Sequence, residues 1–249
     1  MKLSLSPLLI LLFIAIKSFS QQTKEVVERS GSKYNKEKKV YNVLKENKTV
    51  KHGPYQQYYN DILIVSGFYK LDKKDSLWQR NDYRGAVVSK KTYTENNRTG
   101  IWEFFNKDGT TTLQYDFSKD SLLVRKPEPN AIHSYQSSSE EWIAGKADRE
   151  PVWLRSTYEW ESFLNVTLRY PQDAIDNNQQ GVVWVHITVD EDGNAVDFSV
   201  KKSVYPALDE ESIRVVKLSQ PEFVPAMKDG KKVKSDVQVP ITFRMEFGG

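Results

Sequence analysis

The stretch that decides the fold reads Gly181-Val-Val-Trp-Val-His-Ile-Thr-Val-Asp-Glu-Asp-Gly193. Apolar residues occupy every second position from Val183 to Val189. A period of two is what a strand with one buried face requires. Residues 190–194 tolerate positive φ and separate this strand from a second alternating run, Val196 to Val200. The stretch therefore predicts an antiparallel hairpin.

A helix and one long strand are predicted after this hairpin. Asp209 can accept hydrogen bonds from the free amides of a first helical turn, and the helix should end before Pro221. Beyond the Asp229-Gly230 turn, apolar residues of one parity continue from Val233 to Met245. We therefore expect a final strand with one apolar face against the helices.

Seven short segments in the last third of the chain stand in a characteristic order. They are Tyr170-Pro171 with Ala174, Gly181–Gly193, Lys202-Ser203, Leu208-Asp209, Phe223-Val-Pro-Ala226, Gly230-Lys231 and Val239–Arg244. In this order they resemble the C-terminal domain of the TonB energy-transducer family. The resemblance implies that residues 150–249 form a two-layer α/β domain. Helices would lie on one face of a three-stranded antiparallel sheet that binds a partner's extended peptide along its edge.

The final strand is the candidate binding element. If it lies at the sheet edge, main-chain groups from about Lys234 to Met245 are open to an added strand, and proline fits an edge because it donates no hydrogen bond. The resemblance places the Tyr-Pro pair beside the groove. An alternative is that proline and lysines only protect this edge from aggregation. The candidate residues are Tyr170, Pro171, Val237, Val239, Pro240, Ile241 and Phe243.

Residues 1–20 have the pattern of a secretory signal peptide. The uncharged apolar run Leu8–Ile16 is nine residues long, whereas a membrane span needs about 20. We expect cleavage and a periplasmic protein, with an uncleaved inner-membrane anchor as the alternative. The chain has no cysteine, which excludes disulfides and cysteine metal sites. Without Lys2 and Lys17, the chain has 34 basic and 33 acidic residues. A net charge this close to zero gives no electrostatic reason to expect nucleic-acid binding.

A repeat precedes the C-terminal domain. Tyr55, Trp78 and Trp102 are separated by 23 and 24 residues, and each follows a small residue at the same distance. A fixed period of this kind indicates stacked units, each with room for one hairpin. Residues 40–119 are similar to MORN-type hairpin repeats, although Ser76 replaces the expected glycine. The aromatic rings are interpreted as core, with a stacking surface for glycan or peptide as the alternative.

The remaining segments complete an α+β organisation. Residues 21–39 are charged and predict a flexible lead-in, and residues 120–149 predict an exposed linker. The N-terminal region is expected to be all-β, and the C-terminal domain α/β.

Catalytic and metal-binding motifs are not found in the sequence. His52, His133 and His186 have no ligand spacing, and no nucleophile elbow, phosphate loop or dinucleotide turn occurs. We therefore expect a protein that is not an enzyme and needs no cofactor or metal.

Three functional hypotheses follow from the sequence. The first is a periplasmic TonB-like protein that binds an outer-membrane TonB-dependent receptor, or another envelope protein, in TonB-dependent transport. The second is a membrane-anchored, atypical energy transducer in contact with a motor complex. The third is a structural envelope protein whose repeats bind glycan while the C-terminal domain only oligomerises.

Overall fold

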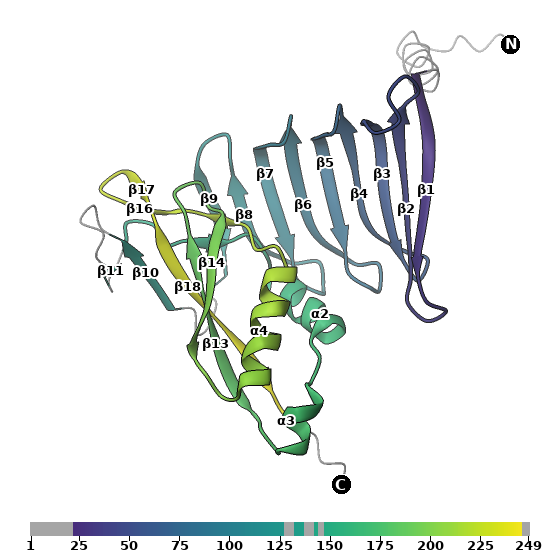
Figure 1. Ribbon diagram of the computed structural model, residues 1–249. Coiled ribbons are helices and arrows are strands. Elements are labelled where there is room, and N and C mark those ends of the chain that lie inside the picture. The colour runs from purple at the N-terminus through teal and green to yellow at the C-terminus, as the bar shows by residue number, and fades with distance from the viewer. Residues whose placement is uncertain (1–21, 127–131, 137–141, 144–146, 246–249) are drawn as a thin grey trace, which may run out of the picture. The chain divides into compact units, whose positions relative to one another are not determined.

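The computed structural model describes residues 22–126, 132–136, 142–143 and 147–245. The chain divides into two compact units, Met1–Arg125 and Lys126–Gly249. The signal peptide predicted at residues 1–20 lies outside the described residues. Each unit has its own sheet (Figure 1). Each also has its own buried side chains.

The first unit is one nine-stranded antiparallel sheet in which each strand pairs with the next along the chain (Figure 1). This order confirms a stack of hairpins in this region, while their identity as MORN repeats stays a prediction. The strands are β1 (Thr23–Gly31), β2 (Lys36–Leu44), β3 (Lys51–Tyr59), β4 (Ile62–Lys70), β5 (Lys73–Asn81), β6 (Val87–Thr94), β7 (Asn97–Phe105), β8 (Thr111–Asp116) and β9 (Ser121–Arg125).

Side chains in tight turns join successive hairpins by hydrogen bonds. Residues 60–61, 71–72 and 95–96 all have positive φ, as two-residue hairpin turns of type I′ require. The Oδ1 atom of Asp72 accepts a hydrogen bond from the main-chain N–H of Lys51 at 2.7 Å, and Asn96 binds Lys74 in the same way at 2.6 Å. The turn residue of one hairpin thus fixes the start of a neighbouring strand.

The sequence repeat is also a repeat of backbone geometry. Gly53, Ser76 and Gly100 all have positive φ, at 126°, 59° and 61°. Glycine adopts this conformation freely, whereas serine does so at a cost. The indole N–H groups of Trp78 and Trp102 each donate to a main-chain carbonyl ten residues earlier, at 3.2 and 2.9 Å. The middle repeat therefore has the same geometry despite its serine.

The sheet starts earlier than the sequence indicated. Residues 21–39 were expected to be a flexible lead-in, but β1 and the first residues of β2 lie within them. Val26 of β1 lies opposite Tyr41, and Val27 lies opposite Val40. Most side chains of β1 are exposed, so its charged composition hid the strand from a pattern search for a buried face.

The second unit contains a five-stranded sheet in the order β11-β10-β18-β13-β14, together with three helices (Figure 1). Its strands are β10 (Ile132–Gln136), β11 (Trp142–Ile143), β12 (Val152–Trp153), β13 (Gly181–Val189), β14 (Ala195–Lys202), β15 (Phe223–Val224), β16 (Ala226–Lys228), β17 (Lys231–Val233) and β18 (Ser235–Phe243). Its helices are α2 (Thr157–Thr167), α3 (Gln172–Asp176) and α4 (Pro206–Leu218).

The helices pack on one face of this sheet, as the α+β prediction required. Apolar residues of one parity in β13 and β18 meet α4 through Leu208, Val215 and Val216, all of them fully buried. The predicted sheet of β18, β13 and β14 is present, but β10 and β11 extend it to five strands. Those two strands, and β9 of the first unit, lie in the segment 120–149 that was expected to be a linker.

The start of α4 differs from the expected cap. The helix begins at Pro206, whose fixed φ suits the first helical position, and Tyr205 is the N-cap residue. Asp209 instead accepts hydrogen bonds from the Ser203 hydroxyl at 2.5 Å and from the main-chain N–H of Val204 at 3.3 Å. The carboxylate therefore holds the loop that enters the helix.

Candidate functional site

The last strand is only partly at an edge. β18 pairs along its whole length with β13, and on its other side β10 pairs with Ser235–Gln238. The expectation that the strand is open from Lys234 onward is therefore corrected for its first half. The chain's own backbone fills that part of the flank because the presumed linker contributes a strand.

Pro240 shows which way the main-chain N–H and C=O groups point in the second half of β18. Its pairing opposite Trp184 belongs to an unbroken ladder with β13, yet proline has no N–H. The main chain of this residue must therefore face away from β13. In an antiparallel sheet the main-chain N–H and C=O groups of every second residue point toward the same neighbouring strand. The main-chain groups of Gln238 and Thr242 therefore also point away from β13. On that side β10 pairs with β18 only as far as Gln238.

An open main-chain segment results. Among the residues that the structure describes, no strand pairs with Val239–Phe243 on the side away from β13. The Thr242 N–H and the carbonyl oxygens of Pro240 and Thr242 face this side, and the Thr242 side chain is exposed. Thr242 was missed in the sequence, although the position of Pro240 two residues earlier was the signal that could have identified it.

Most of the candidate side chains are buried. Val237, Val239, Ile241 and Phe243 are at most 4% exposed and belong to the core under the helices. They hold the strand in place under the helices. Pro240 lies on the opposite face of the sheet and is partly exposed.

The Tyr-Pro pair lies at the far end of this open segment. The ring of Tyr170 meets that of Phe243 edge-on, with centroids 5.5 Å apart, and its hydroxyl donates to the Gln179 carbonyl at 2.6 Å. Burial raises the pKa of Tyr170, which keeps the hydroxyl protonated as a donor. Pro171 is the N-cap residue of α3. The structure thus places Tyr170 at the end of β18.

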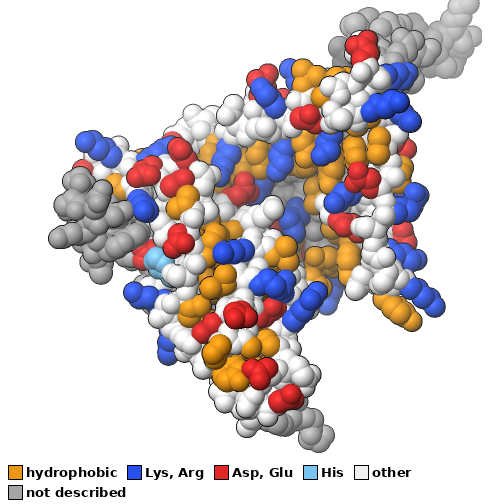
Figure 2. All heavy atoms as spheres, viewed as in Figure 1, with side chains coloured by type: hydrophobic (Ala, Val, Ile, Leu, Met, Phe, Trp, Pro, Cys, Tyr) orange, Lys and Arg blue, Asp and Glu red, His pale blue; other side chains and the backbone are white. Residues whose placement is uncertain are grey.

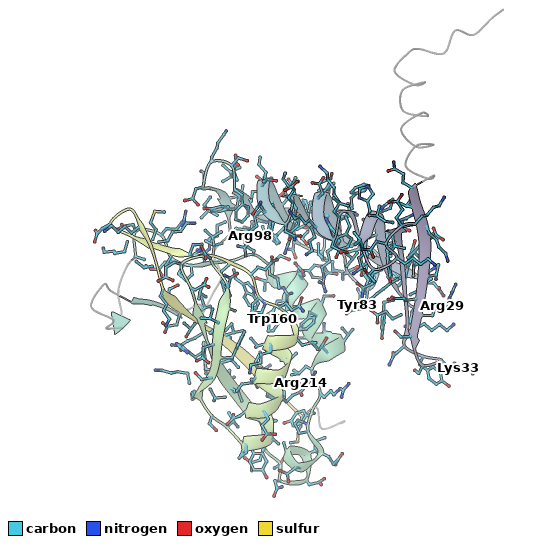
Figure 3. All side chains as sticks on the ribbon, turned by 45° about the horizontal axis from the view of Figure 1, so that its top comes forward. Arg29, Lys33, Tyr83, Arg98, Trp160 and Arg214 are labelled. Carbon is cyan, nitrogen blue, oxygen red and sulfur yellow. The ribbon has the colours of Figure 1, made fainter. Side chains whose placement is uncertain are left out.

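A buried carboxylate fixes the chain that carries Tyr170. Glu211 of α4 accepts a hydrogen bond from the Arg169 N–H at 2.7 Å and two from Arg214 at 2.6 and 2.7 Å. Arg214, which is labelled in Figure 3, also donates to the Thr167 carbonyl at 2.8 Å. The bond to Glu211 raises the pKa of Arg214. No sequence spacing relates Arg169 to Glu211, so this anchor was missed.

His186 joins three strands on the sheet face away from the helices. Its Nε2 atom is 2.9 Å from Oδ2 of Asp236, and its Nδ1 atom is 3.4 Å from the Ser199 hydroxyl. Through its two ring nitrogens His186 on β13 thus contacts β18 on one side and β14 on the other. The arrangement links the three strands side by side, and the serine contact is longer than a typical hydrogen bond.

The aromatic rings of the first unit serve as its core. Trp78 is 7% exposed and Trp102 is completely buried. Lys74 lies over the Trp78 ring at 5.1 Å, and Lys91 over the Trp102 ring at 4.9 Å. Figure 2 shows Lys and Arg side chains among hydrophobic ones on the visible face of this sheet. The rings are thus covered by the protein's own side chains, which favours the core interpretation over glycan stacking.

Residues 166–245 match the family model of the Gram-negative bacterial TonB protein C-terminal domain. The matched segment begins in α2 and contains α3, α4 and the sheet strands β13, β14 and β18, so we refer to it as the TonB-like domain. It includes all seven candidate residues. The match supports a role in envelope transport in general terms, a cell-envelope location and a domain family without catalytic activity.

The other comparisons found no relatives. Neither the curated proteins nor the solved structures contain a match to this chain. Within the described ranges, no helix combines the length and apolar character needed to cross a membrane. No group of three or more potential metal ligands occurs in that part of the chain either.

Proposed function

We propose that the TonB-like domain binds an extended peptide segment of an envelope protein by strand addition to the second half of β18. The observation that carries this proposal is that no described strand pairs with Val239–Phe243 on the side away from β13, next to the end of β10. An added strand would continue the line of β10 and pair with the groups of Pro240 and Thr242.

The chemistry of the flank supports main-chain recognition. The side chains that share the strand with Thr242 are core residues, so a guest receives hydrogen bonds from the backbone while the sheet stays rigid. Tyr170 closes the far end through its contact with Phe243. A guest of only a few residues fits the length left open beyond Gln238.

The partner class that this proposal names is an outer-membrane TonB-dependent receptor, with an extended N-terminal segment as guest. The family match of residues 166–245 supports this choice of partner. Transport would then use the TonB-like domain as an adaptor that contacts the receptor from the periplasmic side.

The proposal is tested by Thr242→Pro. This change removes one donor on the open flank and leaves the ladder with β13 complete, because residue 242 faces away from β13. Thr242→Ala is the matched control, since it keeps the N–H. We expect a labelled receptor peptide to bind the Thr242→Pro protein roughly three- to tenfold more weakly than the control, as loss of one hydrogen bond predicts.

The location of binding is read from amide chemical shifts during the same titration. Shifts on binding should concentrate at residues 239–245 and around Tyr170. Equal affinities of the proline and alanine variants, or shifts concentrated on β14 instead, would refute strand addition at β18.

A further inference from the structure

The first strand of the nine-stranded sheet is unusually regular. Among the described residues β1 is the outer strand of the sheet, and its nine residues pair with β2 without a register shift. Each of the seven other strand pairings in the same sheet contains a register shift. A long strand without bulges at an edge is a template for pairing with another chain.

Other protective features of edge strands are also missing from β1. The strand contains no proline, and it is nine residues long, whereas β9 at the opposite end of the sheet has five. Among the features that protect edge strands from pairing, β1 has only charged side chains. The two positive charges of Lys24 and Arg29 equal the two negative charges of Glu25 and Glu28. A balanced edge does not repel a copy of itself through net charge.

The order of these charges is symmetrical about two valines. The sequence reads Lys24-Glu25-Val26-Val27-Glu28-Arg29. An antiparallel pair of two copies centred between the valines would set like charges opposite each other, which is unfavourable. A shift of one residue, so that Val27 lies opposite itself, sets Glu25 opposite Arg29 twice.

We propose that two copies of this chain pair through β1, antiparallel and centred on Val27, so that the two nine-stranded sheets become one continuous sheet. Glu25 of each copy lies opposite Arg29 of the other, and the two Val27 side chains meet on the two-fold axis. Such an interface is isologous, because the same surface serves on both copies. It lies in the first unit and is independent of the peptide site on β18.

Exposure and existing contacts favour this register. Glu25 and Arg29 are exposed, and Val27 is 39% exposed. Figure 3 shows Arg29 on β1, the outermost strand of the sheet. The register centred on Val26 would instead use Glu28, whose carboxylate already accepts a hydrogen bond from the Tyr41 hydroxyl at 2.5 Å.

Charge reversal tests the interface without relying on a variant that fails to fold. Glu25→Arg and Arg29→Glu each create two like-charge pairs, so the dimer dissociation constant should rise roughly tenfold in each, measured by sedimentation velocity. The two variants mixed together should form a heterodimer, since both opposing pairs are then attractive. Glu46→Arg, an exposed loop residue with the same charge change, is the control and should dimerise like the unchanged protein.

A thiol reports the register directly. The chain has no cysteine, so Val27→Cys introduces a single thiol. Opposed residues of antiparallel strands have Cα atoms about 4.5 to 5.5 Å apart, within the range of a disulfide. Val27→Cys should therefore form a covalent dimer on oxidation. Glu25→Cys should not, because its two copies would lie about 13 Å apart.

Three results would overturn the proposal. They are a monomeric mass of the unchanged protein at every concentration, failure of the mixed charge variants to associate, and cross-linking of Glu25→Cys as efficient as that of Val27→Cys.

Discussion

The two units of this chain build their sheets in opposite ways. In the first unit each strand pairs with its neighbour in sequence, and the turns between them clip one hairpin to the next. In the second unit Ile132 lies opposite Gln238, and β18 lies between strands from two distant parts of the chain. Pairing between strands that are neighbours in the chain produces a regular spacing of residue types in the sequence. Pairing between distant strands produces no such spacing.

The cores differ accordingly. The first unit buries aromatic rings within a single sheet, with lysine and arginine side chains over them. The second buries aliphatic residues of one parity under helices. Stability of the first unit should therefore depend on each repeat and its neighbours, and that of the second on contacts between distant segments.

The largest expected effect comes from Trp102→Ala. Removal of this fully buried ring should lower the free energy of unfolding of the first unit by about 3 to 5 kcal/mol. Hydrogen exchange of the strand amides, measured at increasing denaturant concentration, gives the free energy of unfolding of the first unit. Leu77→Ala, at a residue that is 51% exposed, is the control and should change stability by less than about 1 kcal/mol. Similar losses in both variants would contradict a ring core.

Glu211→Ala tests the non-local anchor of the second unit. The variant leaves the Arg169 N–H and the Arg214 guanidinium without this acceptor, so stability should fall by about 2 to 3 kcal/mol. The neighbouring Glu210 is exposed, and its replacement by alanine should have little effect. Thermal unfolding monitored by near-ultraviolet circular dichroism compares the two. An equal melting temperature for both variants would show that the anchor contributes nothing.

Ser76→Gly sharpens the comparison between repeats and should stabilise the protein. Serine at a φ of 59° carries a strain that glycine lacks, so the free energy of unfolding should rise by about 1 kcal/mol. Gly100→Ser at the equivalent position of the next repeat should lower it by a similar amount. Chemical denaturation of the three proteins provides the measurement. The idea fails if both changes destabilise the first unit.

The last prediction concerns alkaline pH. Burial, and then the charge of nearby Tyr69, raise the pKa of Tyr55 from 10.0 to about 12. The folded state thus favours the neutral phenol, and the resulting stability is complete below pH 10 and is lost as the pH rises from 10 toward 12. Tyr55→Phe should make the stability of the first unit less dependent on pH in this window. Tyrosinate absorbance during titration follows the ionisation itself.

Several elements could be predicted because their signals are local. The hairpin from Gly181 to Lys202 and the Asp229-Gly230 turn appear where alternation and turn residues place them. The repeat of Tyr55, Trp78 and Trp102 correctly indicated stacked hairpins. The start of α4 was displaced because Pro206, rather than Asp209, sets the first turn.

Residue type and spacing along the chain were enough to indicate the hairpin repeat, the buried face of β18 and the resemblance of the last third of the chain to the TonB family. Three features became visible only in the folded protein: β10 covers the first half of β18, Glu211 holds the chain before Tyr170, and β1 pairs with β2 without a register shift. The reason is physical: spacing encodes which face of a strand is buried, whereas the neighbour that its main chain meets depends on backbone hydrogen bonds common to every residue.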